Sequence, residues 1–209
     1  MEILMKGIQN YLLDLLGTER DAVLVEMEDY AYEHDFPIIG PLVGRFLTHY
    51  TQIIDAKRIL ELGSGYGYSA IHFAKATSNE AEIICTDTSE EYKDMAISYF
   101  KRLAISNIKF IVGDALKVIN QLQGEFDIIF NDVDKQEYPQ AFKQAVPRLR
   151  KGGLLITDNA LWYGWVIESK PERASTRGVK AYNKLAFSDP RVFSTILPIG
   201  DGICVSVKQ

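Results

Sequence analysis

The sequence has little cysteine, no positive net charge and no long apolar run, and each shortage excludes a class of protein. Its 209 residues hold two cysteines, Cys85 and Cys204. Both lie in apolar, strand-like segments, so we expect buried, reduced thiols rather than a disulfide pair or a metal site. The net charge of −5 provides no overall positive field for nucleic acid or an anionic membrane. No apolar run reaches the roughly 18 residues that suggest a membrane-spanning helix.

The N-terminus also lacks the features of a secretion signal. Its apolar residues are interrupted by Glu2, Lys6 and Asp14, and no small-residue cleavage site follows. We therefore expect a cytoplasmic protein with no membrane partner. The composition, 47% hydrophobic and 24% charged, is typical of a globular chain. The length fits a single domain over residues 1–209.

The first part of the chain, 1–55, predicts helices only. Apolar residues recur at helical spacing from Ile8 to Leu16, a second helix is expected over 21–33, and a third over 42–53 after two prolines. We expect this part to form an N-terminal helical extension or cap.

From Arg58 onward short apolar runs alternate with amphipathic helices. The expected strands cover 58–62, 82–86, 108–112, 126–131, 153–157, 193–199 and 203–207. The expected helices cover 68–75, 90–103, 116–122, 139–149 and 177–187. This alternation predicts an α/β fold with a doubly wound, mostly parallel sheet and helices on both faces. No helix separates the last two strands, so a tight turn at 200–202 should join them as an antiparallel hairpin.

A glycine-rich turn follows the first expected strand. The strand ends at Glu61-Leu62 and leads into GSGYG, from Gly63 to Gly67. Open α/β sheets bind ligands beyond the carboxyl ends of their strands, where glycines let the backbone approach a ligand. The spacing G-x-G-x-G lacks the pyrophosphate fingerprint G-x-G-x-x-G, which argues against NAD. A plain tight turn is the alternative.

Three carboxylates at strand ends point to the kind of ligand. Asp87 ends the second strand and is placed to accept both ribose hydroxyls of an adenosine. Asp114 follows the third strand and could meet the adenine amino group, while Glu61 could hold an ammonium group. This set suits S-adenosylmethionine better than a dinucleotide. Each carboxylate could instead cap a helix.

A second group of polar residues follows the fourth and fifth strands. Asp132, Asp158 and Asn159 would converge if these strands are neighbours. Two carboxylates and an amide oxygen suit Mg²⁺, Mn²⁺ or Ca²⁺, with water and substrate completing the shell. Lys135 is a candidate general base, because a nearby cation favours its neutral amine. The alternatives are helix caps, turn chemistry and a solvated lysine.

The segments ELGSGYGYSA, TDTSEE, VGDAL, FDIIFNDVDKQEYP, LRKGGLLITDNALWYG and DPRVFSTILPIGDG occur in this order. Together they resemble the cation-dependent O-methyltransferases, the family of catechol and caffeoyl-CoA O-methyltransferases and small bacterial relatives. The resemblance runs from about Phe36 to Lys208. It implies a class I methyltransferase (Rossmann-like) fold with a seven-stranded sheet, usually as a homodimer.

The resemblance also implies roles for individual residues. Asp132, Asp158 and Asn159 match metal ligands, and Lys135 matches the proposed general base. The positions that match the S-adenosylmethionine pocket are Glu61, Gly63, Ser69, Asp87, Asp114 and Asp132, together with Ile38 in the segment that closes over the methionine moiety.

The expected activity is divalent-cation-dependent methylation of a hydroxyl on a small catechol-like or phenylpropanoid-like aromatic. Trp162, Tyr163 and Trp165 could form a wall for the ring, or could be core or dimer contacts.

The main alternative is methylation of a hydroxylated uridine in tRNA. It rests on two basic stretches, one of Lys170, Arg173, Arg177, Lys180 and Lys184, the other of Arg148, Arg150 and Lys151. An NAD-dependent oxidoreductase and a non-catalytic S-adenosylmethionine-binding module are remote alternatives.

Overall fold

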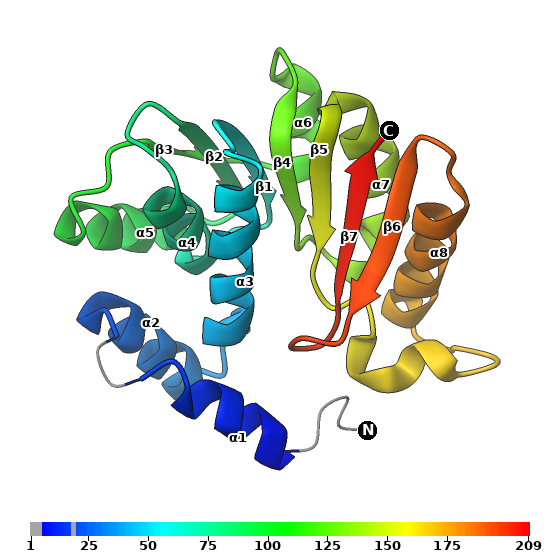
Figure 1. The fold of residues 1–209 in the computed structure, drawn as a ribbon, viewed down its shortest axis with the longest axis horizontal. Helices are drawn as coiled ribbons and strands as arrows, with labels where there is room; N and C mark the ends of the chain where they lie inside the picture. Colours follow the sequence, from blue (N-terminus) through cyan, green and yellow to red (C-terminus); the bar gives the residue numbers. More distant parts are fainter. Residues whose placement is uncertain (1–5, 18–19) are drawn as a thin grey trace.

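A computed structural model describes residues 6–17 and 20–209 of the chain. Its seven strands are β1 (Arg58–Leu62), β2 (Glu82–Asp87), β3 (Ile108–Val112), β4 (Phe126–Asn131), β5 (Leu149–Thr157), β6 (Val192–Leu197) and β7 (Ile203–Lys208). They form one sheet in the order β3-β2-β1-β4-β5-β7-β6 (Figure 1). The strands from β3 to β5 are parallel, and β7 runs antiparallel to both β5 and β6. The expected sheet with its terminal antiparallel hairpin is confirmed.

Helices cover both faces of this sheet (Figure 1). The α-helices are α1 (Lys6–Asp14), α2 (Ala22–Glu33), α3 (Gly40–Ile53), α4 (Tyr68–Ala76), α5 (Glu90–Arg102), α6 (Ala115–Gln121), α7 (Tyr138–Ala145) and α8 (Ala174–Ser188). Helices α6, α7 and α8 pack on one face, while α3 and α4 pack on the other beside α5 and α2. Within the described residues, no helix is long and apolar enough to cross a membrane.

Three short 3₁₀ helices complete the chain, at η1 (Lys135–Glu137), η2 (Val146–Arg148) and η3 (Trp162–Ile167). The helix expected over 139–149 therefore ends at Ala145. Pro147 lacks the backbone N–H that a further α-helical turn needs, and the chain tightens into η2 instead. Strand β5 begins at Leu149, four residues before the expected start.

The central strands are buried on both faces, which explains their almost continuous apolar sequences. On β4, Ile128 and Phe130 pack under α3 and α4, while Ile129 faces α7 and α8. The two cysteines lie on β2 and β7, and both are buried and free, as expected. Because this core fixes strand register, it also fixes which residues emerge together at the carboxyl ends of the strands.

Candidate active site

The carboxyl ends of β1, β4 and β5 bring three predicted site residues side by side. Leu62 pairs with Asn131, and Asn131 with Thr157, so the residues that follow emerge at the same edge. There the backbone N–H of Asp132 donates to the Leu62 carbonyl at 2.9 Å. The backbone N–H of Asp158 donates to the Asn131 carbonyl at 3.2 Å. The sheet therefore gathers Gly63, Asp132 and Asp158 as the sequence predicted.

A cavity of about 480 Å³ opens at this edge. Most of the predicted site residues line it, namely Ile38, Gly63, Ser69, Asp87, Asp132, Lys135, Asp158 and Asn159. Two others lie elsewhere. Glu61 is fully buried behind the serines of the cavity wall, and Asp114 does not line the cavity.

Asp132 and Asp158 form the acidic side of the cavity. Burial, reinforced by the charge of Asp132, raises the pKa of Asp158 to about 8. Burial also raises the pKa of Asp132, against the opposing effect of Lys135, whose Nζ lies 2.8 Å from the Asp132 Oδ1. A cation beside these two carboxylates favours the ionised form of both, because it offsets their repulsion.

This donor set fits a hard divalent cation. Asn159 lines the same cavity and would add an amide oxygen to the two carboxylates, and its backbone N–H donates to the Asp158 Oδ1 at 2.8 Å. Within the part of the chain that the structure describes, no group of three or more His, Cys, Asp or Glu could hold a metal. Any cation at Asp132 and Asp158 would therefore depend on the amide, water and substrate for its remaining ligands.

Lys135 is held in place from several sides. It begins η1, and its Nζ lies 5.5 Å from the ring centre of Tyr138 and 5.6 Å from that of Trp162. Gly178 on α8 packs against it so closely that a Cβ there would lie 2.2 Å from the Lys135 carbonyl oxygen. This glycine lets α8 support the turn that carries Lys135. Sequence reasoning missed it, because only the tertiary packing identifies it.

Glu61 is an ionisable group that is fully buried behind the cavity wall. The hydroxyls of Ser64 and Ser69 both donate to its carboxylate. Burial nevertheless raises its pKa to about 7. Burial disfavours the ionised carboxylate even with these two hydrogen bonds, so Glu61 is suited to pair with a positively charged ligand group beyond the serines.

Asp87 and Asp114 have different surroundings, although both follow strands. The Asp87 carboxylate accepts the backbone N–H of Gly65 at 2.9 Å, so it holds the glycine-rich turn while lining the cavity. The Asp114 carboxylate accepts the N–H groups of Leu116 and Lys117 and caps α6. The helix-cap alternative therefore describes the observed geometry of Asp114, and its contact with adenine stays a prediction.

The segment between α2 and α3 closes the other side of the cavity. Phe36, Pro37, Ile38 and Ile39 line it, and a Cβ on Gly65 would lie 2.9 Å from the Phe36 ring. The absence of a side chain at Gly65 allows this close packing. Phe36 is thus positioned over the glycine-rich turn, and Ile38 lines the same cavity.

Asp201 is a site residue to which the sequence analysis gave no role. It lies in the turn between β6 and β7, and its Oδ1 accepts the backbone N–H of Tyr163 at 2.6 Å. The carbonyls of Asp201 and Gly202 accept the N–H groups of Leu161 and Ala160. This turn therefore holds the loop that carries Asn159. The LPIGDG segment contained the signal, but an aspartate between two glycines was attributed to turn chemistry alone.

The three aromatic residues after β5 pack against one another. Ring-centre distances among Trp162, Tyr163 and Trp165 are between 5.1 and 5.8 Å. Tyr163 lines the cavity and is 57% exposed. Both Trp162 and Tyr163 have positive φ angles, of 45° and 54°. The turn therefore holds the exposed Tyr163 ring at the cavity that Lys135 also lines.

Comparisons with known proteins show which family this chain resembles. A family model described as O-methyltransferase matches residues 17–209. The chain is 31% identical to a catechol O-methyltransferase of Niastella koreensis, over 98% of this chain and 93% of that protein. It is 33% identical to a caffeoyl-CoA O-methyltransferase of Eucalyptus gunnii, over 94% and 85% of the two chains. A crystal structure of an O-methyltransferase from Bacillus cereus in complex with SAH superimposes with a TM-score of 0.88 at 30% identity, covering 97% of each chain.

Proposed function

Because this chain belongs to the O-methyltransferase family, as its motifs predicted, we propose that it methylates a hydroxyl of a small catechol-like or phenylpropanoid-like aromatic. The methyl donor is S-adenosylmethionine, and the reaction requires a divalent cation. One observation carries the proposal: Asp132, Lys135, Asp158 and Asn159 line the same cavity as the glycine-rich turn. Membership of the family argues against the NAD-dependent oxidoreductase.

The acidic wall of the cavity supports the choice of methyl donor, which supplies the methyl group as a sulfonium. Glu61 is placed to attract the ammonium of the methionine moiety through the Ser64–Ser69 wall, and Asp87 to accept ribose hydroxyls. The excess of carboxylates in the cavity favours a cationic ligand over a dinucleotide. The SAH-bound structure from Bacillus cereus is independent support.

The donor set described above supports the cation. Asp132, Asp158 and Asn159 would hold it, and a bound divalent cation would stabilise negative charge on an acceptor oxygen. The preference among Mg²⁺, Mn²⁺ and Ca²⁺ does not follow from oxygen donors alone. A bound divalent cation would also offset the repulsion between the two carboxylates, which supports its place in the proposal.

Lys135 is positioned to take the proton of the acceptor hydroxyl. Its Nζ bonds to Asp132, so it must exchange this bond for one to the hydroxyl when the acceptor binds. The rings of Tyr138 and Trp162 limit its movement. Placement of the oxygen toward the methyl group is the chain's other contribution. Tyr163 is the exposed ring best placed to contact an aromatic acceptor.

Methylation of tRNA is the alternative that the methyl-transfer assay below distinguishes. Arg148 donates to the carbonyls of Ile119, Leu122 and Gly124, and Arg150 donates to Asp127. Arg148 ends η2 just before β5 and Arg150 lies near the start of β5, whereas Asp158 follows the other end of this strand. One of the two basic clusters is therefore engaged in structural bonds away from the candidate site.

Transfer of a labelled methyl group from S-adenosylmethionine tests the proposal. The acceptors are a catechol, a caffeoyl ester, a flavonoid and total tRNA, each with and without a divalent ion. We expect ion-dependent labelling of at least one aromatic, loss of labelling in Lys135→Ala, and retention in Lys143→Ala, a matched lysine on α7. Labelling of tRNA alone would replace the acceptor class. Binding of S-adenosylmethionine without labelling of any acceptor would favour the non-catalytic module.

A further inference from the structure

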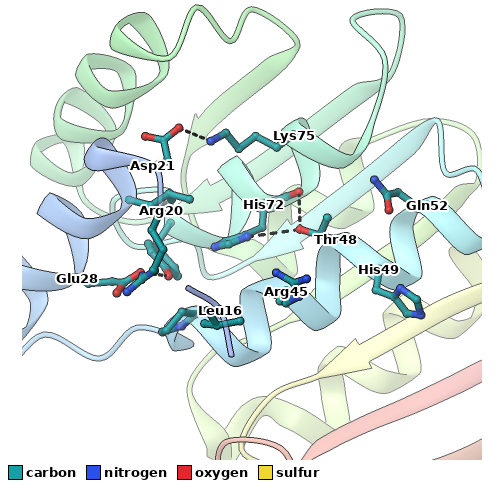
Figure 2. Close-up of a pocket in the computed structure, with 13 residues that line it drawn as sticks. Leu16, Arg20, Asp21, Glu28, Arg45, Thr48, His49, Gln52, His72 and Lys75 are labelled. Carbon is teal, nitrogen blue, oxygen red and sulfur yellow. Dashed lines mark hydrogen bonds and ion pairs between the residues drawn. The ribbon is translucent and has the colours of Figure 1, made fainter. Parts of the chain in front are cut away.

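A second cavity of about 420 Å³ lies between helix α2, with the residues before it, and helices α3 and α4 (Figure 2). Its walls come from Leu16, from residues 20–28, from α3 between Pro41 and Gln52, and from α4 between Tyr68 and Lys75. Tyr68 lines both cavities. The volume of the second cavity falls within the roughly 300–1,000 Å³ that is typical of small-molecule sites. The proposed methyl transfer makes no use of it.

The two cavities have opposite charge. The candidate active site is lined by five aspartates, Asp87, Asp132, Asp134, Asp158 and Asp201, against one lysine. The second cavity is lined by three fixed cations, Arg20, Arg45 and Lys75, against two carboxylates, Asp21 and Glu28. The lining of the second cavity therefore has an excess of one positive charge, which favours an anionic occupant in a chain whose net charge is −5.

Ion pairs already engage two of these cations. Arg20 pairs with Glu28, which also accepts the Tyr68 hydroxyl at 2.6 Å, and Lys75 pairs with Asp21. These bonds connect α2 and the residues before it to α4, and they give the cavity a fixed wall. Among the described residues, Arg45 has no carboxylate partner and is exposed on α3. Its guanidinium is therefore available for an anion.

A histidine and a threonine complete the polar lining. The Nδ1 of His72 lies 3.5 Å from the Thr48 hydroxyl, and the ring packs so tightly on Gly44 that a Cβ there would lie 2.3 Å from its Nε2. Among the described residues this Nε2 is buried without a hydrogen-bond partner. Burial lowers the pKa of His72 to about 4. The ring is therefore neutral near pH 7 and adds a polar but uncharged group to the cavity lining.

The remaining lining gives the cavity an amphipathic character. Leu16, Leu24 and Pro41 supply apolar surface, while His49 and Gln52 add hydrogen-bonding groups near Arg45 (Figure 2). A ligand with an anionic head and a compact apolar body matches this distribution. Inorganic ions alone would leave the apolar surface uncovered.

We propose that the second cavity binds a small organic anion, with its phosphate or carboxylate at Arg45 and its apolar body against Leu16, Leu24 and Pro41. The site is independent of the methyl-transfer site, although the two share Tyr68. It does not rest on the proposed function.

Isothermal titration of the full chain with phenyl phosphate, benzoate and neutral benzyl alcohol tests this site. We expect saturable binding of at least one of the two anions, weakened by added salt, and the tighter anion identifies the preferred head group. Arg45→Gln should weaken that binding at least about tenfold. Arg191→Gln, an exposed arginine outside both cavities, should leave it unchanged. Circular dichroism checks that both variants are folded.

Each titration is repeated with saturating S-adenosylhomocysteine, so that the two sites are distinguished. We expect the anion to bind in both conditions. The proposal is overturned if neither anion binds saturably, if benzyl alcohol binds as tightly as the anions, if Arg45→Gln has no effect, or if S-adenosylhomocysteine displaces the anion mole for mole. Failure of S-adenosylhomocysteine to bind would count against the proposed function alone.

Discussion

Replacing Glu61 with glutamine should stabilise the ligand-free protein at alkaline pH and weaken its binding of S-adenosylmethionine. Burial raises the pKa of Glu61 from 4.5 to about 7. Between these values the folded protein binds more protons than the unfolded chain, so its stability falls as pH rises. At about 1.4 kcal/mol per pKa unit, the loss reaches about 3 kcal/mol above pH 7 and is about 1 kcal/mol near pH 5. Glutamine keeps hydrogen-bonding atoms toward Ser64 and Ser69 but cannot ionise.

Urea denaturation of wild type and Glu61→Gln near pH 5 and pH 8 measures this difference. We expect the variant's advantage in the free energy of unfolding to grow by about 2 kcal/mol between the two pH values. Glu125→Gln, at an exposed carboxylate, is the matched control and should show no such growth. Calorimetry should show weaker cofactor binding in Glu61→Gln alone. If the stability advantage of Glu61→Gln is absent or does not grow with pH, burial does not disfavour the ionised Glu61 carboxylate and the reasoning is refuted.

Three further substitutions test the site. Asp158→Ala should lower ion-dependent turnover by about 10²–10³-fold while calorimetry shows cofactor binding largely intact; unchanged turnover would contradict a role in holding the cation. Lys135→Ala should lower kcat by about 10²–10⁴-fold with a smaller effect on KM, and an unchanged kcat would exclude it as the base. Gly178→Ala should lower the free energy of unfolding by about 1–3 kcal/mol, because its Cβ meets the Lys135 backbone. Gly7→Ala, where a Cβ meets nothing within 4 Å, is its control in the same denaturation assay.

The strands were predictable because their signal is local and strong. Apolar runs such as Arg58–Leu62 and Phe126–Asn131 end at polar or glycine residues, and the structure has both strands with those bounds. The handedness of the strand–helix–strand crossovers does not by itself fix the order of the strands, so the neighbourhood of β4 and β5 was a condition of the prediction that the structure meets. The 3₁₀ helix from Trp162 to Ile167 was not predicted, because long-range bonds from the β6–β7 turn shape it.

The candidate site was predictable where it depends on strand ends. Asp132 and Asp158 follow adjacent strands, so sheet register alone brings them together. Asp87 and Asp114 look alike in sequence, yet only Asp87 faces the cavity, because Asp114 turns to the N–H groups that begin α6. Asp201 acts on a loop about 40 residues away, which no local pattern reveals.

The second cavity was invisible in the sequence for the same reason. Its lining comes from three segments, and only their packing brings Arg20, Arg45 and Lys75 together. His72 is one of the residues that line this cavity. It is tightly packed on Gly44, and it also contributes to a cavity wall that helical spacing does not indicate.

The most direct test of the divalent-cation requirement is to remove and restore the metal during methyl transfer to an aromatic diol. After treatment with EDTA and removal of the chelator, labelled S-adenosylmethionine is supplied with the acceptor, and Mg²⁺, Mn²⁺ or Ca²⁺ is added back separately. We expect labelling to cease on chelation and to return with at least one of these ions in the wild type, but not in Asp158→Ala. Full activity that persists without any divalent ion would contradict the account.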